Sequence, residues 1–281
     1  MNQSLPWWER LLRKIRCTIF FWKAERGVWV FDLDGPLMDT GVFYDRALDE
    51  FSRELFKVFD GKFSVVKILD KQHELDLGMM YDINPRTQKP YLLHKSRFPL
   101  SLVRCYKYFC KEANVKFDRT TARKLSAIGK GVFCKEKYPK AIRSEVFPLF
   151  KFLKCVMGEK VFILTKGDEE IQGDKRKALE KAGIMRFCDG FFVVPDHKNA
   201  KIKEIKRKNP ALHYYCVGDT YKEDVEIGMR LHFFGIYIPY KYNWKERGKF
   251  SDIEYYRNKE RSVRCSSIAE ISSWFNTIKD A

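Results

Sequence analysis

The sequence predicts an α/β protein built on a parallel sheet, with a helical segment inserted into it. Three observations carry this prediction. Short apolar runs alternate with segments of helical periodicity, as in a parallel sheet whose two faces are covered by helices. Acidic or hydroxyl side chains follow three of these runs directly. A long stretch of helical pattern, residues 39–139, separates the first run from the second.

The composition fits this class. The chain has 281 residues and is 45% hydrophobic, which is enough for a full core in one large domain or one domain with an insertion. Its eight cysteines include no CxxC pair, so we expect reduced thiols and not a disulfide framework or a zinc site. No apolar run reaches the roughly 20 residues that cross a bilayer, and no small-residue cleavage site follows the N-terminal apolar patch. We therefore expect a cytoplasmic protein.

The net charge of +17 is the strong deviation in the composition. Lysine and arginine are dense in residues 198–209, 241–249 and 255–264. Such a surplus attracts polyanions or anionic membranes, so nucleic acid is one partner class that the charge allows. The alternative is a solvated basic surface without a specific partner.

Residues 4–26 have the pattern of an amphipathic helix. Apolar residues between Trp8 and Trp22 recur at helical spacing on one stripe, and the basic residues between Arg10 and Arg16 lie off it. The stripe can pack on the body of the protein, lie on a membrane surface as a peripheral contact, or bind a partner protein.

Residues 28–31, VWVF, predict a buried first strand that ends at two acids, Asp32 and Asp34. Side chains at positions i and i+2 of a strand point to the same side, so the two carboxylates are expected to face one pocket. Gly35 and Pro36 then turn the chain away.

The insertion divides the chain into three expected parts. Residues 1–26 form the N-terminal helix, residues 27–38 and 140–281 form the α/β core, and residues 39–139 form a helical domain. Within the core, the order of elements after the insertion is a helix at 143–156, a strand at 160–165, a helix ending at Gly183, a strand at 191–195, a helix at 198–209, a strand ending at Val217, a further helix, and a last strand at 233–240. This order predicts a Rossmann-like parallel sheet.

Ligands of such sheets bind at the carboxyl ends of the strands. At these ends stand Asp32 and Asp34, then Thr165, then Asp219, with Asp224 five residues later. Buried carboxylates repel one another, and a hard cation with oxygen ligands relieves the repulsion. Magnesium typically takes one or two carboxylates together with a substrate phosphate. We therefore expect a Mg²⁺ and phosphate site, with a lysine from the basic segments neutralising the remaining charge.

Three motifs in this order resemble those of the haloacid dehalogenase superfamily of phosphohydrolases. FDLDG, LTKGD and GDTYKED match its first, second and fourth motifs, and the insertion lies where the superfamily places its helical cap domain. The resemblance covers residues 28 to about 240. It implies a cap that closes over the active site, excludes water and selects the substrate.

The resemblance also implies roles for single residues. Asp32 would be the nucleophile that forms an aspartyl-phosphate, and Asp34 the acid that protonates the leaving oxygen and then the base that activates water. Thr165 would bind a phosphate oxygen. Mg²⁺ would be held by Asp32, Asp219 and the backbone carbonyl of Asp34, and Asp224 would support the metal site directly or through water.

The chain departs from the superfamily pattern at two points. Pro36 stands where Thr or Val is usual, which fixes φ and removes an N–H donor. The third motif is a lysine that precedes a helix and would bind phosphate, and its position in this sequence is ambiguous. We choose Lys198, and Lys201 is the alternative.

The function implied is a magnesium-dependent phosphomonoesterase acting through an aspartyl-phosphate. A cap favours a small phosphorylated substrate, such as a nucleotide or a sugar phosphate. The net charge of +17 instead favours a substrate among nucleotides or nucleic-acid ends. One alternative is a phosphomutase with the same residues. Another is a basic module associated with nucleic acid or membranes that carries a vestigial site.

Overall fold

A computed structural model describes residues 27–240 and 261–271. The predicted helix at 4–26 and the basic segment at 241–249 lie outside the described residues, so the helix and its membrane contact remain predictions. No helix within the described ranges is both long and apolar enough to span a membrane. The seven cysteines in the same ranges are free thiols.

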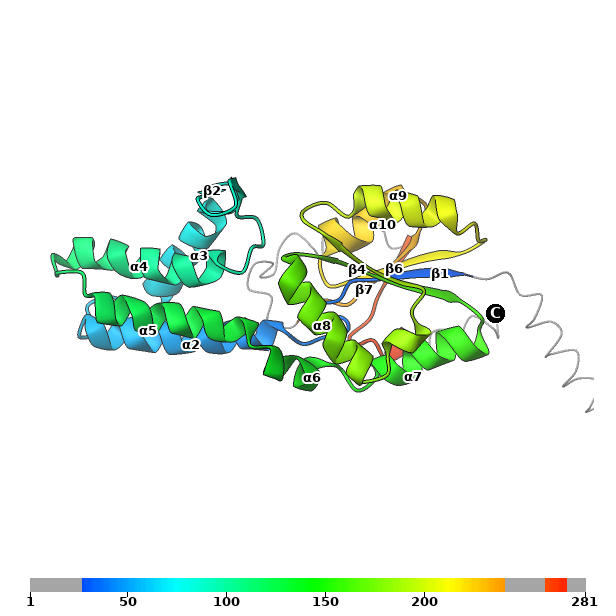
Figure 1. Cartoon of the computed structure of the whole chain (residues 1–281), viewed down its shortest axis with the longest axis horizontal. Coiled ribbons are helices and arrows are strands. Elements are labelled where there is room, and N and C mark those ends of the chain that lie inside the picture. Colours follow the sequence, from blue (N-terminus) through cyan, green and yellow to red (C-terminus); the bar gives the residue numbers. More distant parts are fainter. Residues whose placement is uncertain (1–26, 241–260, 272–281) are drawn as a thin grey trace, which may run out of the picture.

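Six parallel strands form the central sheet, in the order β5-β4-β1-β6-β7-β8 (Figure 1). The strands are β1 Val28–Phe31, β4 Lys160–Lys166, β5 Gly190–Val194, β6 Tyr214–Gly218, β7 Phe234–Tyr237 and β8 Ser262–Arg264. The α/β fold class predicted from the sequence is thereby confirmed.

Strand β1 lies at the centre of the sheet, which explains why all four of its residues are apolar. Trp29 and Phe31 face one side and belong to a core cluster with α7 and α8. Val28 and Val30 face the other side and pack with residues of α9. These helices are α7 Val146–Lys151, α8 Glu169–Lys181 and α9 Asn199–Lys208. In Figure 1, α9 and α10 (Ile227–Arg230) cover one face of the sheet, and α7 and α8 cover the other.

Three elements differ from their predictions. The predicted last strand, β7, is followed at the sheet edge by β8 (Ser262–Arg264), which the sequence did not reveal because it is short and lies in a charged segment. The predicted helix at 143–156 is α7 followed by a π-helical turn, Phe152–Val156. The helix after β6 also begins as a π-helical turn, Tyr221–Glu226, before α10.

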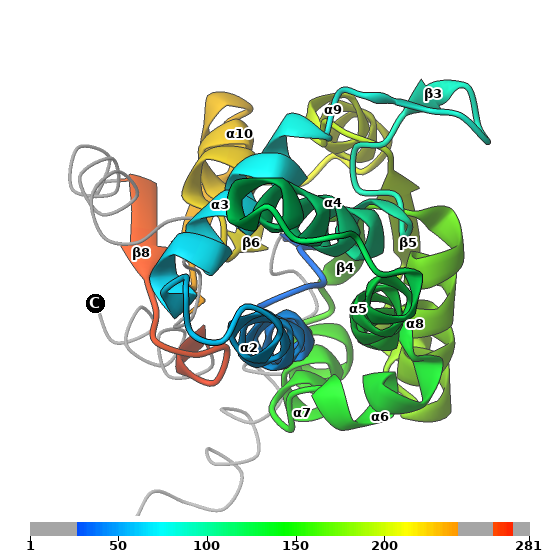
Figure 2. The ribbon, with the colours of Figure 1, turned by 90° about the vertical axis from the view of Figure 1, so that its left-hand side faces the viewer.

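The inserted segment has its own hydrophobic core. Its main helices are α2 Gly41–Val58, α3 Val65–Gly78, α4 Arg97–Ala113 and α5 Arg119–Lys130, and a small hairpin of β2 Ile83–Asn84 and β3 Lys89–Pro90 joins α3 to α4. The core includes Phe51, Leu55, Leu102 and Phe109. Figure 2 looks onto this segment, with α2, α4 and α5 seen nearly end-on in front of the sheet.

Candidate active site

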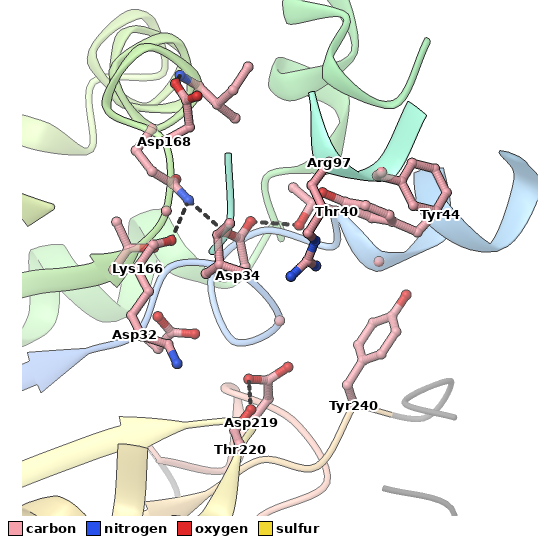
Figure 3. Close-up of a pocket in the computed structure, with 18 of the residues that line it drawn as sticks. Asp32, Asp34, Thr40, Tyr44, Arg97, Lys166, Asp168, Asp219, Thr220 and Tyr240 are labelled. Atoms are coloured by element: carbon pink, nitrogen blue, oxygen red, sulfur yellow. Dashed lines mark hydrogen bonds between the residues drawn. The ribbon is translucent and has the colours of Figure 1, made fainter. Parts of the chain in front are cut away.

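The strand register brings the predicted site residues to one edge of the sheet. Phe31 of β1 is paired with Ile163 of β4 and with Val217 of β6. Asp32 therefore lies one residue beyond the paired position. Thr165 in β4 and Asp219 directly after β6 each lie two residues beyond it. All of them line a single pocket of about 340 Å³ between the sheet and the helical insertion, shown in Figure 3.

The turn after β1 is shaped by Gly35. Its φ of +95° is in the left-handed region, and a Cβ built there would lie 2.3 Å from Oδ2 of Asp219. The turn is held by backbone N–H groups of Gly35, Leu37 and Met38 and by Nε of Arg143, which donates to the Gly35 carbonyl at 2.8 Å. The donor that Pro36 lacks is not needed for any of these bonds, so the proline is compatible with the turn.

Substitution of Gly35 by alanine is expected to displace Asp219 as well as strain the backbone. We expect Gly35→Ala to lower the free energy of unfolding by about 2–4 kcal/mol, measured by urea denaturation, because a left-handed residue costs about 1–2 kcal/mol and the overlap adds to it.

Gly158→Ala is the matched control. Gly158 also has a positive φ, +69°, but no heavy atom lies within 4 Å of an added Cβ, so only the backbone cost of about 1–2 kcal/mol is expected. Equal losses in the two variants would show that Asp219 does not approach Gly35 closely.

Three carboxylates cluster around Lys198. Oxygens of Asp32, Asp219 and Asp224 lie within 4.8 Å of one another. The Nζ of Lys198 donates to Asp32 Oδ1 at 2.5 Å and to Asp224 Oδ1 at 2.6 Å. Asp219 has no such partner: among the described side chains, its one hydrogen bond is accepted from the Thr220 hydroxyl at 3.4 Å. The cluster therefore holds more negative charge than Lys198 neutralises.

The pKa values of the cluster reflect its burial first and this excess charge second. Burial raises the pKa of Asp32 to about 7, with Lys198 opposing the rise and Asp224 adding to it. Burial likewise raises the pKa of Asp219 well above its ordinary value, and the neighbouring carboxylates add to the rise. Burial alone would lower the pKa of Lys198, but Asp224 and Asp32 outweigh it and raise that pKa. A divalent cation beside Asp219 would remove the cost of ionising these carboxylates.

The structure distinguishes the two candidate lysines. Lys198 is buried at the head of α9 and lies in the pocket. Lys201 points elsewhere: its Nζ pairs with Glu204 on the same helix at 2.5 Å and lies 4.9 Å from the centre of the Phe192 ring. Of these two, only Lys198 contacts the acidic cluster.

Asp34 is held by three residues that the sequence did not single out. Lys175 Nζ donates to both carboxylate oxygens, at 2.7 and 2.8 Å, Thr40 donates its hydroxyl proton at 2.6 Å, and Gln172 donates at 3.2 Å. Burial would raise the pKa of Asp34, but Lys175 and these hydrogen bonds outweigh it and lower the pKa. Asp34 is therefore ionised and fixed in orientation.

A signal for two of these residues was present in the sequence. Gln172 and Lys175 lie on the same buried face of α8 as Ile171, Ala178 and Leu179. Amide and ammonium groups on the apolar face of a helix that begins just after the Thr165 strand indicate a polar site below them.

The comparisons with known proteins agree with this architecture. No protein-family model matches the chain, and no curated protein matches it by sequence. Among solved structures, the chain is similar to a haloacid dehalogenase-like family hydrolase from Xanthomonas campestris, with 16% identity over 92% of this chain and 93% of that one and a TM-score of 0.61.

Two further structures are similar. One is described as a dehalogenase, with 14% identity over 89% of this chain and 96% of that one and a TM-score of 0.52. The other is a haloacid dehalogenase-like hydrolase from Burkholderia xenovorans, with 13% identity over 88% of this chain and 94% of that one and a TM-score of 0.51. With its sheet order and its helical insertion after the first strand, the chain has the fold of the haloacid dehalogenase-like hydrolases.

Proposed function

We propose that the protein is a haloacid dehalogenase superfamily phosphomonoesterase that depends on Mg²⁺ and acts through an aspartyl-phosphate on a small organic phosphate, such as a nucleotide or a sugar phosphate. The observation that carries the proposal is the position of Lys198, which bridges Asp32 and Asp224 beside Asp219. A nucleophilic carboxylate, a fixed ammonium and excess acidic oxygens are the parts that phosphoryl transfer requires.

In this proposal Asp32 attacks phosphorus and displaces the alcohol of the substrate. The new bond joins a carboxylate oxygen to phosphorus, and the bond from phosphorus to the leaving oxygen breaks. Lys198 and the hydroxyl of Thr165 offset charge on the phosphoryl oxygens. Thr165 is buried and lines the same pocket, so its hydroxyl is in place before the substrate binds.

Asp34 is assigned the proton transfers. A base must be ionised to take a proton from the attacking water, and Lys175 keeps Asp34 in that form. Protonation of the leaving oxygen is correspondingly harder for a carboxylate with a lowered pKa. We therefore expect aryl phosphates to be cleaved faster than alkyl phosphates in the first step, whereas the second step, hydrolysis of the aspartyl-phosphate, has its base already ionised.

The donor set fits Mg²⁺. Asp32 and Asp219, with the backbone carbonyl of Asp34, would hold the ion, and Asp224 would support it directly or through water. Carboxylate and carbonyl oxygens are the ligands that Mg²⁺ takes, and Asp219 is the carboxylate of the cluster without a basic partner among the described side chains. When bound, the ion would neutralise charge that develops on the phosphoryl oxygens.

Removal of the metal tests the proposal. We expect hydrolysis of 4-nitrophenyl phosphate to fall to background when EDTA is added and to return when excess Mg²⁺ is restored, because the carboxylates repel the substrate phosphate without the cation. The release of nitrophenolate measures the rate. Activity that persists in EDTA would contradict the metal requirement.

A further inference from the structure

We infer that the pocket contains a second anion-binding site, formed by Arg97 of the helical insertion, and that this site takes a carboxylate of the substrate. The inference rests on the proposed function, because it places the phosphoryl group of the same substrate at Asp32. The substrate would then be a small phosphomonoester with a carboxylate at some distance from the phosphate.

The hydrogen bonding of Arg97 is incomplete. Its side chain is 7% exposed, and its Nη2 donates to Oδ2 of Asp76 at 3.0 Å. Among the residues that the structure describes, Nε and Nη1 of Arg97 have no hydrogen-bond partner, and neither does Oδ1 of Asp76. Unpaired donors on a buried charged group are costly. An ion pair that served stability alone would be expected to engage both carboxylate oxygens of Asp76 and both sides of the guanidinium. A ligand that accepts from Arg97 would satisfy these donors.

Arg97 shares a cavity with the reaction centre. It lines the same pocket as Asp32, Thr165 and Lys198. In Figure 3, its guanidinium projects from the insertion into the space bounded by Asp34, Thr40 and Tyr240. Burial raises the pKa of the Tyr44 phenol, and of the two charges Asp34 adds to the rise and Arg97 opposes it, so Tyr44 lies near both. A small ligand at Asp32 is thus within the same cavity as the unpaired donors.

The charge around Arg97 favours a singly charged group. Asp76 already offsets much of the guanidinium charge, and Asp45 also lines the pocket, whereas the pocket lysines Lys166 and Lys175 are already paired with Glu223 and Asp34. A second phosphate, with its double charge, would meet net repulsion from these acids. A carboxylate needs only one positive charge and accepts two hydrogen bonds from a guanidinium.

The test compares matched substrates. ω-Carboxyalkyl phosphates of increasing chain length are assayed against ω-hydroxyalkyl phosphates of the same length, and kcat/KM is measured for each. At the length that spans the two sites, we expect the carboxylate to be preferred by about 10- to 100-fold, the value of a hydrogen bond to a charged group. In Arg97→Gln this ratio should fall to near one.

The matched control is Arg104→Gln. Arg104 lies on the same helix and pairs with Asp82 at 2.8 Å, but it is exposed and does not line the pocket, so the preference should be kept. Because Arg97→Gln leaves Asp76 buried without its partner, the double variant Asp76→Asn/Arg97→Gln is measured as well, and it should show the same loss of preference.

Three results would overturn the inference: equal use of carboxylate and hydroxyl substrates at every length, a preference that survives in the Arg97 variants, or better use of α,ω-bisphosphates than of carboxylates. Binding is measured separately from turnover with ω-phosphonocarboxylates and ω-hydroxyalkylphosphonates. The carboxylates should raise the Tm of the wild-type protein more than the alcohols do, and this difference should vanish in Arg97→Gln. This binding difference without any hydrolysis would refute the proposed function and leave the Arg97 site standing, whereas hydrolysis without the difference would do the reverse.

Discussion

Asp32→Asn is expected to lower kcat by about 10⁴-fold or more, because it replaces the proposed nucleophilic carboxylate with an amide, which cannot form the covalent intermediate. The folded structure should persist. Asparagine has nearly the same shape, and from a cluster of three carboxylates it removes the one at Asp32, whose pKa burial raises to about 7. Turnover of 4-nitrophenyl phosphate with excess Mg²⁺ measures the loss.

Asp196→Asn serves as its control. Asp196 lies two residues before Lys198, and its carboxylate lies 3.2 Å from Nε2 of the neighbouring His197 on the surface. Its activity should match that of the wild-type protein. An Asp32→Asn protein that is folded and keeps more than a small fraction of wild-type turnover would rule out the covalent mechanism.

Lys198→Met is expected to lower kcat/KM by about 10³-fold, comparable to the loss of an important electrostatic group in an active site. It should also destabilise the protein in the absence of metal. Lys198 is buried against two carboxylates, and removing one partner of a buried ion pair costs about 3–5 kcal/mol. Steady-state kinetics and urea denaturation measure the two effects.

Lys201→Met tests the alternative lysine under the same conditions. Lys201 and Glu204 form a partly exposed pair one helical turn apart, which contributes about 0–1 kcal/mol, and we expect little change in kcat/KM. If Lys201→Met produced the larger loss of activity, the placement of Lys198 at the phosphate would be wrong.

The strands and their ends were predictable because each depends on a local pattern. Residues 28–31 are uniformly apolar since both faces of β1 are buried. The carboxyl ends of parallel strands then meet at one edge, and this rule alone brings Thr165 and Asp219 to Asp32. The alternation of strands and helices likewise predicted the sheet without any knowledge of its strand order.

The residues that surround the acids were not predictable in the same way. The helical pattern places Lys175 on the buried face of α8, but Lys175 contacts Asp34 across 141 positions of sequence, and no spacing rule relates two such positions. Arg97 begins a helix of the insertion and looks in sequence like any other basic residue of a protein with 54 lysines and arginines. Whether the guanidinium donors of Arg97 find hydrogen-bond partners depends on how the folded chain packs, which no local sequence pattern shows. Strand β8 was missed because three residues at a sheet edge carry too little apolar pattern.

The central claim is that Asp32 carries the phosphoryl group during turnover. Rapid quenching of the enzyme during hydrolysis of 4-nitrophenyl phosphate with Mg²⁺, followed by borohydride reduction, converts an aspartyl-phosphate to homoserine. Peptide mass spectrometry then locates the reduced residue. We predict homoserine at position 32 when substrate and Mg²⁺ are both present, and none when either is omitted. Turnover that leaves Asp32 unreduced while another residue carries the phosphoryl group would contradict the account.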